Sequence, residues 1–146
     1  MATRTPGGAS DWDPADPLVT DQDVLCRVDR LLDPGSWRQR SVWLMFLSGD
    51  GTQLPVVVPV DDVPEQPDPQ LVGNLCQVIA DVLADAAPEG SAVITLTRPG
   101  SETVGDADRY WFRALYGAAR EQHASIRMLC LATQAGVRQL TLDDAG

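Results

Sequence analysis

The sequence contains no lysine and only one histidine, and these two shortages limit the ligands and metals that the protein can bind. All 11 basic residues are arginines, against 21 acidic residues, so the formal net charge is −10. Because a protein that binds nucleic acid needs a basic face for the phosphates, we expect no nucleic-acid partner. A zinc site needs several imidazole, thiolate or carboxylate ligands converging on the metal, and His123 as the single histidine argues against one.

Long apolar runs and paired cysteines are also missing. No stretch approaches the ~20 apolar residues of a transmembrane helix, so no membrane partner is expected. The N-terminal segment lacks the apolar stretch of a signal peptide. Cys26, Cys76 and Cys130 are widely spaced among apolar residues, which predicts buried free thiols in a reducing compartment. We therefore expect a cytoplasmic protein with no metal and no other cofactor.

The length of 146 residues and the hydrophobic content of 44% fit one globular domain. Residues 1–18 are rich in proline, glycine, aspartate and serine and carry few large apolar side chains. Such a segment buries too little surface to offset its loss of conformational entropy. The sequence therefore predicts a disordered N-terminal tail over residues 1–18 and a single domain over residues 19–146.

Hydrophobic periodicity divides that domain into alternating helices and strands. Apolar residues recur at helical spacing in three segments, 21–32, 70–86 and 106–122. Short runs rich in β-branched and apolar residues predict five strands, 41–48, 54–60, 91–97, 126–133 and 137–142. The resulting order, α-β-β-α-β-α-β-β, predicts an α/β domain with one mixed sheet of about five strands and helices packed on it.

Three of the strands carry further positional signals. Residues 41–48 are almost continuously apolar, which favours a strand covered on both faces. Residues 54–60 contain Pro55 and Pro59, which have no N–H to donate and so indicate an edge strand. The β-branched run 91–97 is expected at the centre of the sheet.

The candidate site follows the predicted central strand. In α/β sheets the functional crevice lies beyond the carboxyl ends of the strands, where the next helix begins. The polar residues gathered at this place are Arg98, Ser101, Glu102, Asp106 and Asp108. Two interpretations stay open: these residues bind an anion or supply a general base, or they serve only to start the helix and to form ion pairs.

Residues 92–101, the acidic loop after them and the helix over 106–115 resemble the core of the JAB/MPN superfamily, closest to its bacterial RadC branch. In that family an apolar strand leads into His-x-His-Pro-Ser-Gly, and Ser-x-x-Asp opens the next helix. The hairpin over 41–60, the helix over 70–86 and the final hairpin over 126–142 also follow the order of the family. The resemblance therefore covers about residues 40–142 and implies a JAB/MPN-like fold.

The departures from the family pattern concern its metal ligands. Leu96 and Arg98 stand where the two metal-binding histidines would be, and Asp106 stands near the serine. Arg109 takes the place of the metal-binding aspartate, with Asp108 one residue earlier. The resemblance thus implies a degenerate domain that lacks the zinc centre, and zinc-dependent peptidase activity is not expected.

Two functions follow from this reading. The favoured one is a non-catalytic interaction or scaffold domain, with no catalytic residue and with a protein partner or a second copy of the chain as its ligand. The alternative is a small-molecule-binding protein or a metal-independent enzyme that uses the loop between Arg98 and Asp108. The proline-guarded edge at Pro55 and Pro59 leaves the C-terminal hairpin as the expected place of dimerisation.

Arg98 itself carries a structural hypothesis. It follows a run of small and apolar residues in the strand expected to be most buried. A desolvated guanidinium costs several kcal/mol unless an opposite charge and hydrogen bonds meet it. Glu102, Asp106 and Asp108 are the nearest carboxylates in the sequence. We expect an Arg98–Asp108 pair that joins the end of the strand to the following helix.

Overall fold

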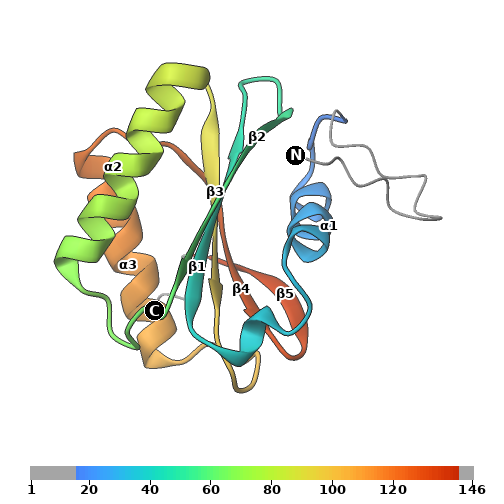
Figure 1. The fold of residues 1–146 in the computed structure, drawn as a ribbon, viewed down its shortest axis with the longest axis vertical. Coiled ribbons are helices and arrows are strands. Elements are labelled where there is room, and N and C mark those ends of the chain that lie inside the picture. The colour runs from blue at the N-terminus through green and yellow to red at the C-terminus, as the bar shows by residue number, and fades with distance from the viewer. Residues whose placement is uncertain (1–15, 142–146) are drawn as a thin grey trace.

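The sheet is mixed, and β3 (Ser91–Thr97) is its central strand. The computed structural model describes residues 16–141, and in this part of the chain the strands lie in the order β2-β1-β3-β4-β5 (Figure 1). The other strands are β1 (Ser41–Leu47), β2 (Gln53–Asp61), β4 (Ile126–Thr133) and β5 (Gly136–Leu140). This single α/β domain with a five-stranded mixed sheet confirms the predicted fold class.

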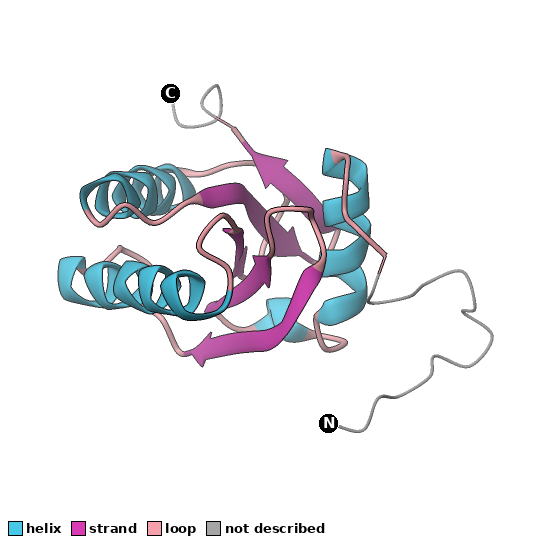
Figure 2. Ribbon diagram, turned by 90° about the horizontal axis from the view of Figure 1, so that it is seen from above, coloured by secondary structure: helices cyan, strands magenta, loops and turns pink. Residues whose placement is uncertain are grey.

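Helices cover both faces of the sheet. α2 (Pro69–Ala86) and α3 (Asp106–Glu121) lie on one face, and α1 (Asp21–Leu31) lies on the other (Figures 1 and 2). A short 3-10 helix, η1 (Ser36–Arg38), follows α1 and was not predicted from the sequence. No helix within the described residues is long and apolar enough to cross a membrane.

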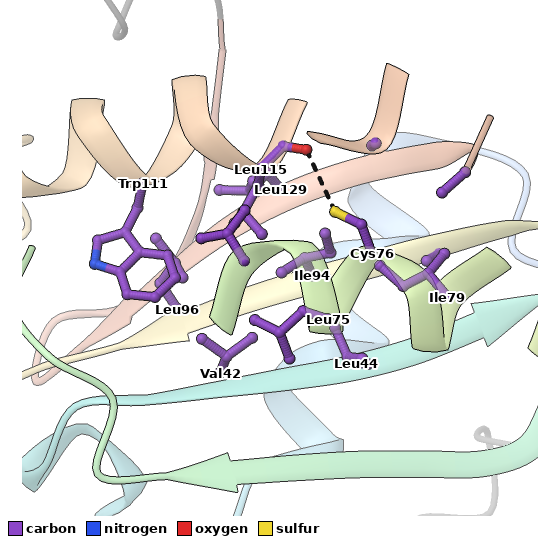
Figure 3. Close-up of a cluster of buried hydrophobic side chains, with 14 of the residues drawn as sticks. Val42, Leu44, Leu75, Cys76, Ile79, Ile94, Leu96, Trp111, Leu115 and Leu129 are labelled. Carbon is purple, nitrogen blue, oxygen red and sulfur yellow. Dashed lines mark hydrogen bonds between the residues drawn. The ribbon is translucent and has the colours of Figure 1, made fainter. Parts of the chain in front are cut away.

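Coverage on both faces explains why β1 is apolar along its length. Successive side chains of a strand point to opposite faces. Val42, Leu44 and Phe46 belong to the core under α2 and α3, and Figure 3 shows part of this cluster. Met45 and Leu47 pack on the opposite face in a second core that includes residues of α1. The prediction of a strand buried on both faces is confirmed.

The pairing of the strands confirms two predicted positions, β2 at an edge of the sheet and β3 at its centre. β1 pairs antiparallel with β2 and with β3, whereas β3 and β4 are parallel and are connected through α3. β5 pairs antiparallel with β4 and forms the second edge of the sheet. β2 is the other edge, as Pro55 and Pro59 indicated, and β3 is central.

The ordered domain includes Leu18, which the sequence assigned to the tail. Its side chain is 7% exposed and packs in the core under α1, and its N–H donates to the carbonyl of Gly51 at 2.9 Å. Gly51 has a φ of 90°, and a Cβ there would meet the Leu18 carbonyl oxygen at 2.8 Å. The turn between β1 and β2 therefore needs glycine for two reasons. Residues 1–15 of the predicted tail lie outside the described residues.

One of the three cysteines departs from the prediction of buried thiols. Cys76 and Cys130 are fully buried, but Cys26 is exposed on α1. The apolar neighbours of Cys26 in the sequence face the sheet, whereas Cys26 lies on the outer side of the helix next to Gln22, whose amide nitrogen is 3.4 Å from its sulfur. Burial raises the pKa of the Cys130 thiol to about 12, and burial also raises the pKa of Cys76.

We expect a neutral thiol reagent to modify one cysteine in the folded protein and all three after unfolding in guanidinium chloride. Cys76 and Cys130 are protected because their sulfurs are buried and protonated, and only the thiolate reacts. The reaction is followed by the absorbance of the coloured product that a neutral aromatic disulfide releases when a thiol attacks it. Cys26→Ser should remove the fast-reacting group, and equal reaction rates for all three thiols would contradict the packing described here.

Candidate functional site

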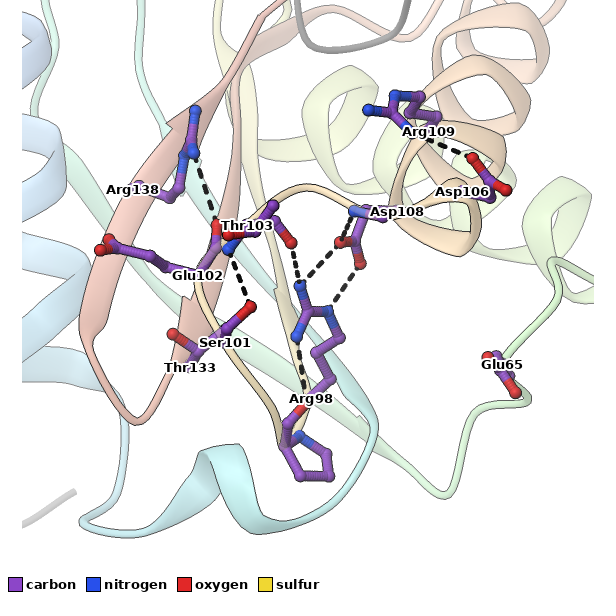
Figure 4. A network of polar contacts seen from close by, with 12 residues as sticks. Glu65, Arg98, Ser101, Glu102, Thr103, Asp106, Asp108, Arg109, Thr133 and Arg138 are labelled. Carbon is purple, nitrogen blue, oxygen red and sulfur yellow. Dashed lines mark hydrogen bonds and ion pairs between the residues drawn. The ribbon is translucent and has the colours of Figure 1, made fainter.

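The predicted site lies in the loop that connects β3 to α3. Arg98 directly follows β3, and Asp108 is in the first turn of α3. Because β3 and β4 are parallel, their carboxyl ends meet at one edge of the sheet, which is the usual place for a ligand crevice in α/β proteins. Figure 4 shows how the loop folds back over the Arg98 side chain.

Arg98 and Asp108 form a buried bidentate ion pair. The Arg98 Nε donates to Oδ1 of Asp108 at 2.8 Å, and Nη2 donates to Oδ2 at 2.8 Å. Both residues are buried, with 8% and 3% of their surface exposed. The fork of the guanidinium matches the two carboxylate oxygens in this geometry. The pair expected from the sequence is confirmed.

The loop supplies the remaining partners of this pair. Nη1 of Arg98 donates to the Pro99 carbonyl at 3.0 Å, and Nη2 also donates to the Thr103 carbonyl at 3.0 Å. Oδ2 of Asp108 accepts a further hydrogen bond from the Gly105 N–H at 2.9 Å, just before α3 begins. The carboxylate therefore serves both the guanidinium and the amino end of the helix, where negative charge is stabilising.

The other predicted site residues do not join this pair. Ser101 accepts from the Thr103 N–H at 3.3 Å and so stabilises a turn within the loop. Asp106 is exposed and pairs with Arg109 at 3.0 Å along the surface of α3. Glu102 is also exposed, and its backbone carbonyl lies 3.4 Å from a guanidinium nitrogen of Arg138. The structure brings together Arg98 and Asp108 and leaves Ser101, Glu102 and Asp106 at the surface.

The space beside the buried pair is nearly filled. The cavity there measures about 10 Å³ and is lined by Arg40, Ser41, Val63, Leu96, Thr97, Arg98, Asp108 and Trp111. A single water needs roughly that much room, so a substrate does not fit. Trp111 closes one side, and its indole N–H donates to the Glu65 carbonyl at 2.9 Å. The cleft is thus occupied by the chain's own side chains.

A larger hollow at the same edge of the sheet was missed by the sequence reading. We call it the Trp43 groove; it measures about 330 Å³ and is lined by Asp33, Pro34, Gly35, Ser36, Gln39, Ser41, Trp43, Pro59 and Asp61. A second hollow of about 280 Å³ lies on the other side of the same α1–η1 loop, against the end of β4 and the start of β5. The residues come from two stretches of the chain, 33–43 and 59–61, and no local motif connects them. The only signal in the sequence was the alternation that turns Trp43 away from Val42 and Leu44.

Hydrogen bonds hold the floor of the Trp43 groove. The Trp43 indole N–H donates to Ser41 Oγ at 3.1 Å, and the Ser41 hydroxyl hydrogen-bonds Thr97 Oγ1. Thr97 Oγ1 in turn donates to the Gln39 carbonyl at 2.9 Å. Because the Thr97 hydroxyl has one proton, Ser41 must be the donor to Thr97. The Trp43 N–H and the hydroxyls of Ser41 and Thr97 therefore each donate one hydrogen bond, and none of these three donors is free.

Comparisons with known proteins add no assignment: no family model, no curated protein and no solved structure matches the chain. Within residues 16–141 no group of three or more histidine, cysteine, aspartate or glutamate side chains is placed to hold a metal ion.

We expect Arg98→Ala to lower the free energy of unfolding by ~3–5 kcal/mol, because Asp108 would keep a buried charge without its partner. Chemical denaturation measures the effect. Arg109→Ala is the matched control, since it removes an arginine–aspartate pair of the same helix turn that is exposed, and such pairs contribute ~0–1 kcal/mol. A loss for Arg98→Ala no larger than that for Arg109→Ala would contradict a structural role for the buried pair.

Proposed function

We propose that the chain is a non-catalytic interaction domain. The observation that carries the proposal is the closed cleft at Arg98 and Asp108, in which the polar groups bind one another and about 10 Å³ remains. A catalytic site needs room for a substrate against its reactive groups. The alternative, a ligand site or metal-independent enzyme built on this loop, lacks such room. The uncharged buried thiols of Cys76 and Cys130 support a reducing, cytoplasmic location as part of the proposal.

We propose further that the domain is a degenerate relative of the JAB/MPN superfamily. The order of elements supports this relation, because a hairpin, a helix, a buried strand, a loop and a second helix follow one another as in that family. In this proposal the Arg98–Asp108 pair occupies the place of the lost metal centre. An internal ion pair can hold the strand end and the helix start together where a metal would otherwise do so.

The partner that we propose is a second copy of the chain, bound through β5. On β2, Pro59 lies opposite Trp43, and this pair cannot be hydrogen-bonded because proline has no N–H. The Pro59 nitrogen therefore faces the outer edge and removes a donor there. β5 contains no proline and ends the sheet on the other side. The edge that remains competent for strand pairing is thus β5.

The register of β5 identifies the backbone groups that would pair. Thr133 and Gly136 flank a two-residue turn and form a hydrogen-bonded pair, so the next such pair is Leu131 with Arg138. The intervening residues Val137 and Gln139 therefore direct their N–H and C=O groups outward, where the Gln139 carbonyl accepts a long hydrogen bond from Arg138 Nε at 3.4 Å that strand pairing would replace. Two copies related by a two-fold axis at Gln139 would exchange these groups and form a continuous ten-stranded sheet.

We expect the protein to be a dimer by light scattering at high micromolar concentration and Gln139→Pro to be a monomer. The substitution removes an N–H that β4 does not use, so the domain should still fold. Gln139→Val keeps the N–H and is the matched control, which should remain dimeric. A wild-type monomer, or a Gln139→Pro variant that melts cooperatively and is still dimeric, would contradict pairing through β5.

A further inference from the structure

The Trp43 groove lies at the ligand-binding edge of the sheet, beside the closed cleft but separate from it. The groove opens where β1 begins and β3 ends, and the neighbouring hollow lies at the end of β4. The two hollows share residues 33–36, the α1–η1 loop and the first residue of η1, as a common wall. The carboxyl ends of parallel strands meet at this edge, which is where α/β folds place ligands.

The polar lining of the groove is rich in hydrogen-bond acceptors. Ser41 and Thr97 use their hydroxyl protons within the hydrogen-bond chain of the floor, and the indole N–H of Trp43 is used there as well. The carboxylates of Asp33 and Asp61 are exposed on the lining and accept only. Gln39 turns its amide donor toward Asp61 at 3.4 Å. The Ser36 hydroxyl also lines the groove and can donate, but the charged groups of the lining accept only, so a ligand that matches them must bring donors.

The apolar part of the lining is aromatic and cyclic. Trp43 lines the groove, and because its N–H is bound by Ser41, what the indole has left for a ligand is its apolar ring. Pro34 and Pro59 also line the groove, and Pro59 is the cross-strand neighbour of Trp43. An indole face attracts a cation, and the attraction grows when carboxylates stand nearby.

The arginines nearest to the groove already have partners. The guanidinium of Arg38 lies over the ring of Trp37 at 5.2 Å from the ring centroid, next to Gly35. Arg40 lies 3.8 Å from the carboxylate of Glu65, on the side of the closed cleft. Asp33 and Asp61 have no ion pair among the described residues, so no arginine is paired with the two carboxylates of the lining, although Arg38 places a positive charge beside Gly35.

We propose that the Trp43 groove binds the guanidinium group of an arginine-containing ligand. A guanidinium carries only donors, is planar enough to stack on the indole, and is more weakly hydrated than an ammonium. Asp33 and Asp61 neutralise its charge, and Trp43 supplies the stacking surface. The groove assignment rests on the proposed function in one respect, that the domain acts by binding, and it uses a surface separate from the β5 edge.

The test is a titration of the ¹⁵N-labelled full chain, followed by NMR in physiological salt, with N-acetyl-arginine amide. The expected result is saturable shifts of the Trp43 indole N–H and of the amides of Ser36 and Gln39, with the buried Trp111 indole unmoved. N-acetyl-citrulline amide has the same shape without the charge and should bind about tenfold more weakly. An arginine-containing pentapeptide is titrated in parallel to distinguish a peptide ligand, which should bind about tenfold more tightly than the amide, from a free small molecule.

Variants distinguish binding at the groove from binding that depends only on the net negative charge of the protein. Asp33→Asn combined with Asp61→Asn should weaken binding about tenfold, because both carboxylates are lost and both positions are exposed. Asp81→Asn combined with Asp85→Asn removes the same two charges from the exposed side of α2, across the sheet, and should leave binding unchanged. Gln139→Pro should also bind normally, so failure of the β5 dimer and failure of the groove are measured independently.

Three results would overturn the proposal. Equal binding of the citrulline and arginine amides would show that charge is not recognised. Equal weakening by the Asp81→Asn/Asp85→Asn pair and by the Asp33→Asn/Asp61→Asn pair would mean that the ligand follows net charge only. The absence of saturable shifts at Trp43 with either arginine probe would mean that the groove does not bind a guanidinium.

Discussion

A buried guanidinium must have its charge and its donors met, and the loop between β3 and α3 is built around that requirement for Arg98. The carboxylate of Asp108 takes two of the hydrogen bonds, and the carbonyls of Pro99 and Thr103 take two more. The same carboxylate accepts the N–H of Gly105 where α3 begins. One ion pair therefore fixes the end of the central strand, the path of the loop and the start of the helix.

The same pair closes one part of the sheet edge at the carboxyl ends of β3 and β4, next to a part that stays open. On one side of β1 the Arg98–Asp108 pair and Trp111 fill the cleft, so this side contributes stability. On the other side the α1–η1 loop stands away from Trp43 and leaves a groove of about 330 Å³. Both sides share Ser41, whose hydroxyl is bound to Thr97 at the end of β3. A closed cleft beside an open groove fits the proposal of a domain that acts by binding.

The features set by local patterns could be predicted from the sequence, and those that depend on packing between distant segments could not. The central strand, the proline-marked edge and the Arg98–Asp108 pair each follow from residue types within about ten positions of one another. Cys26 was placed inside because its neighbours are apolar, although helical spacing turns it outward. The Trp43 groove joins a turn, a strand and an edge strand, and no spacing in the sequence connects them.

The most direct test of the buried pair as the organising contact is a double-mutant cycle with Arg98→Met, Asp108→Leu and the combination of the two. Each single variant leaves a buried polar group or charge without its partner, whereas the double variant removes both. The account predicts that the double variant is less destabilised than the sum of the singles, with a coupling energy of about 2 kcal/mol. Free energies of unfolding that add to within ~0.5 kcal/mol would contradict it.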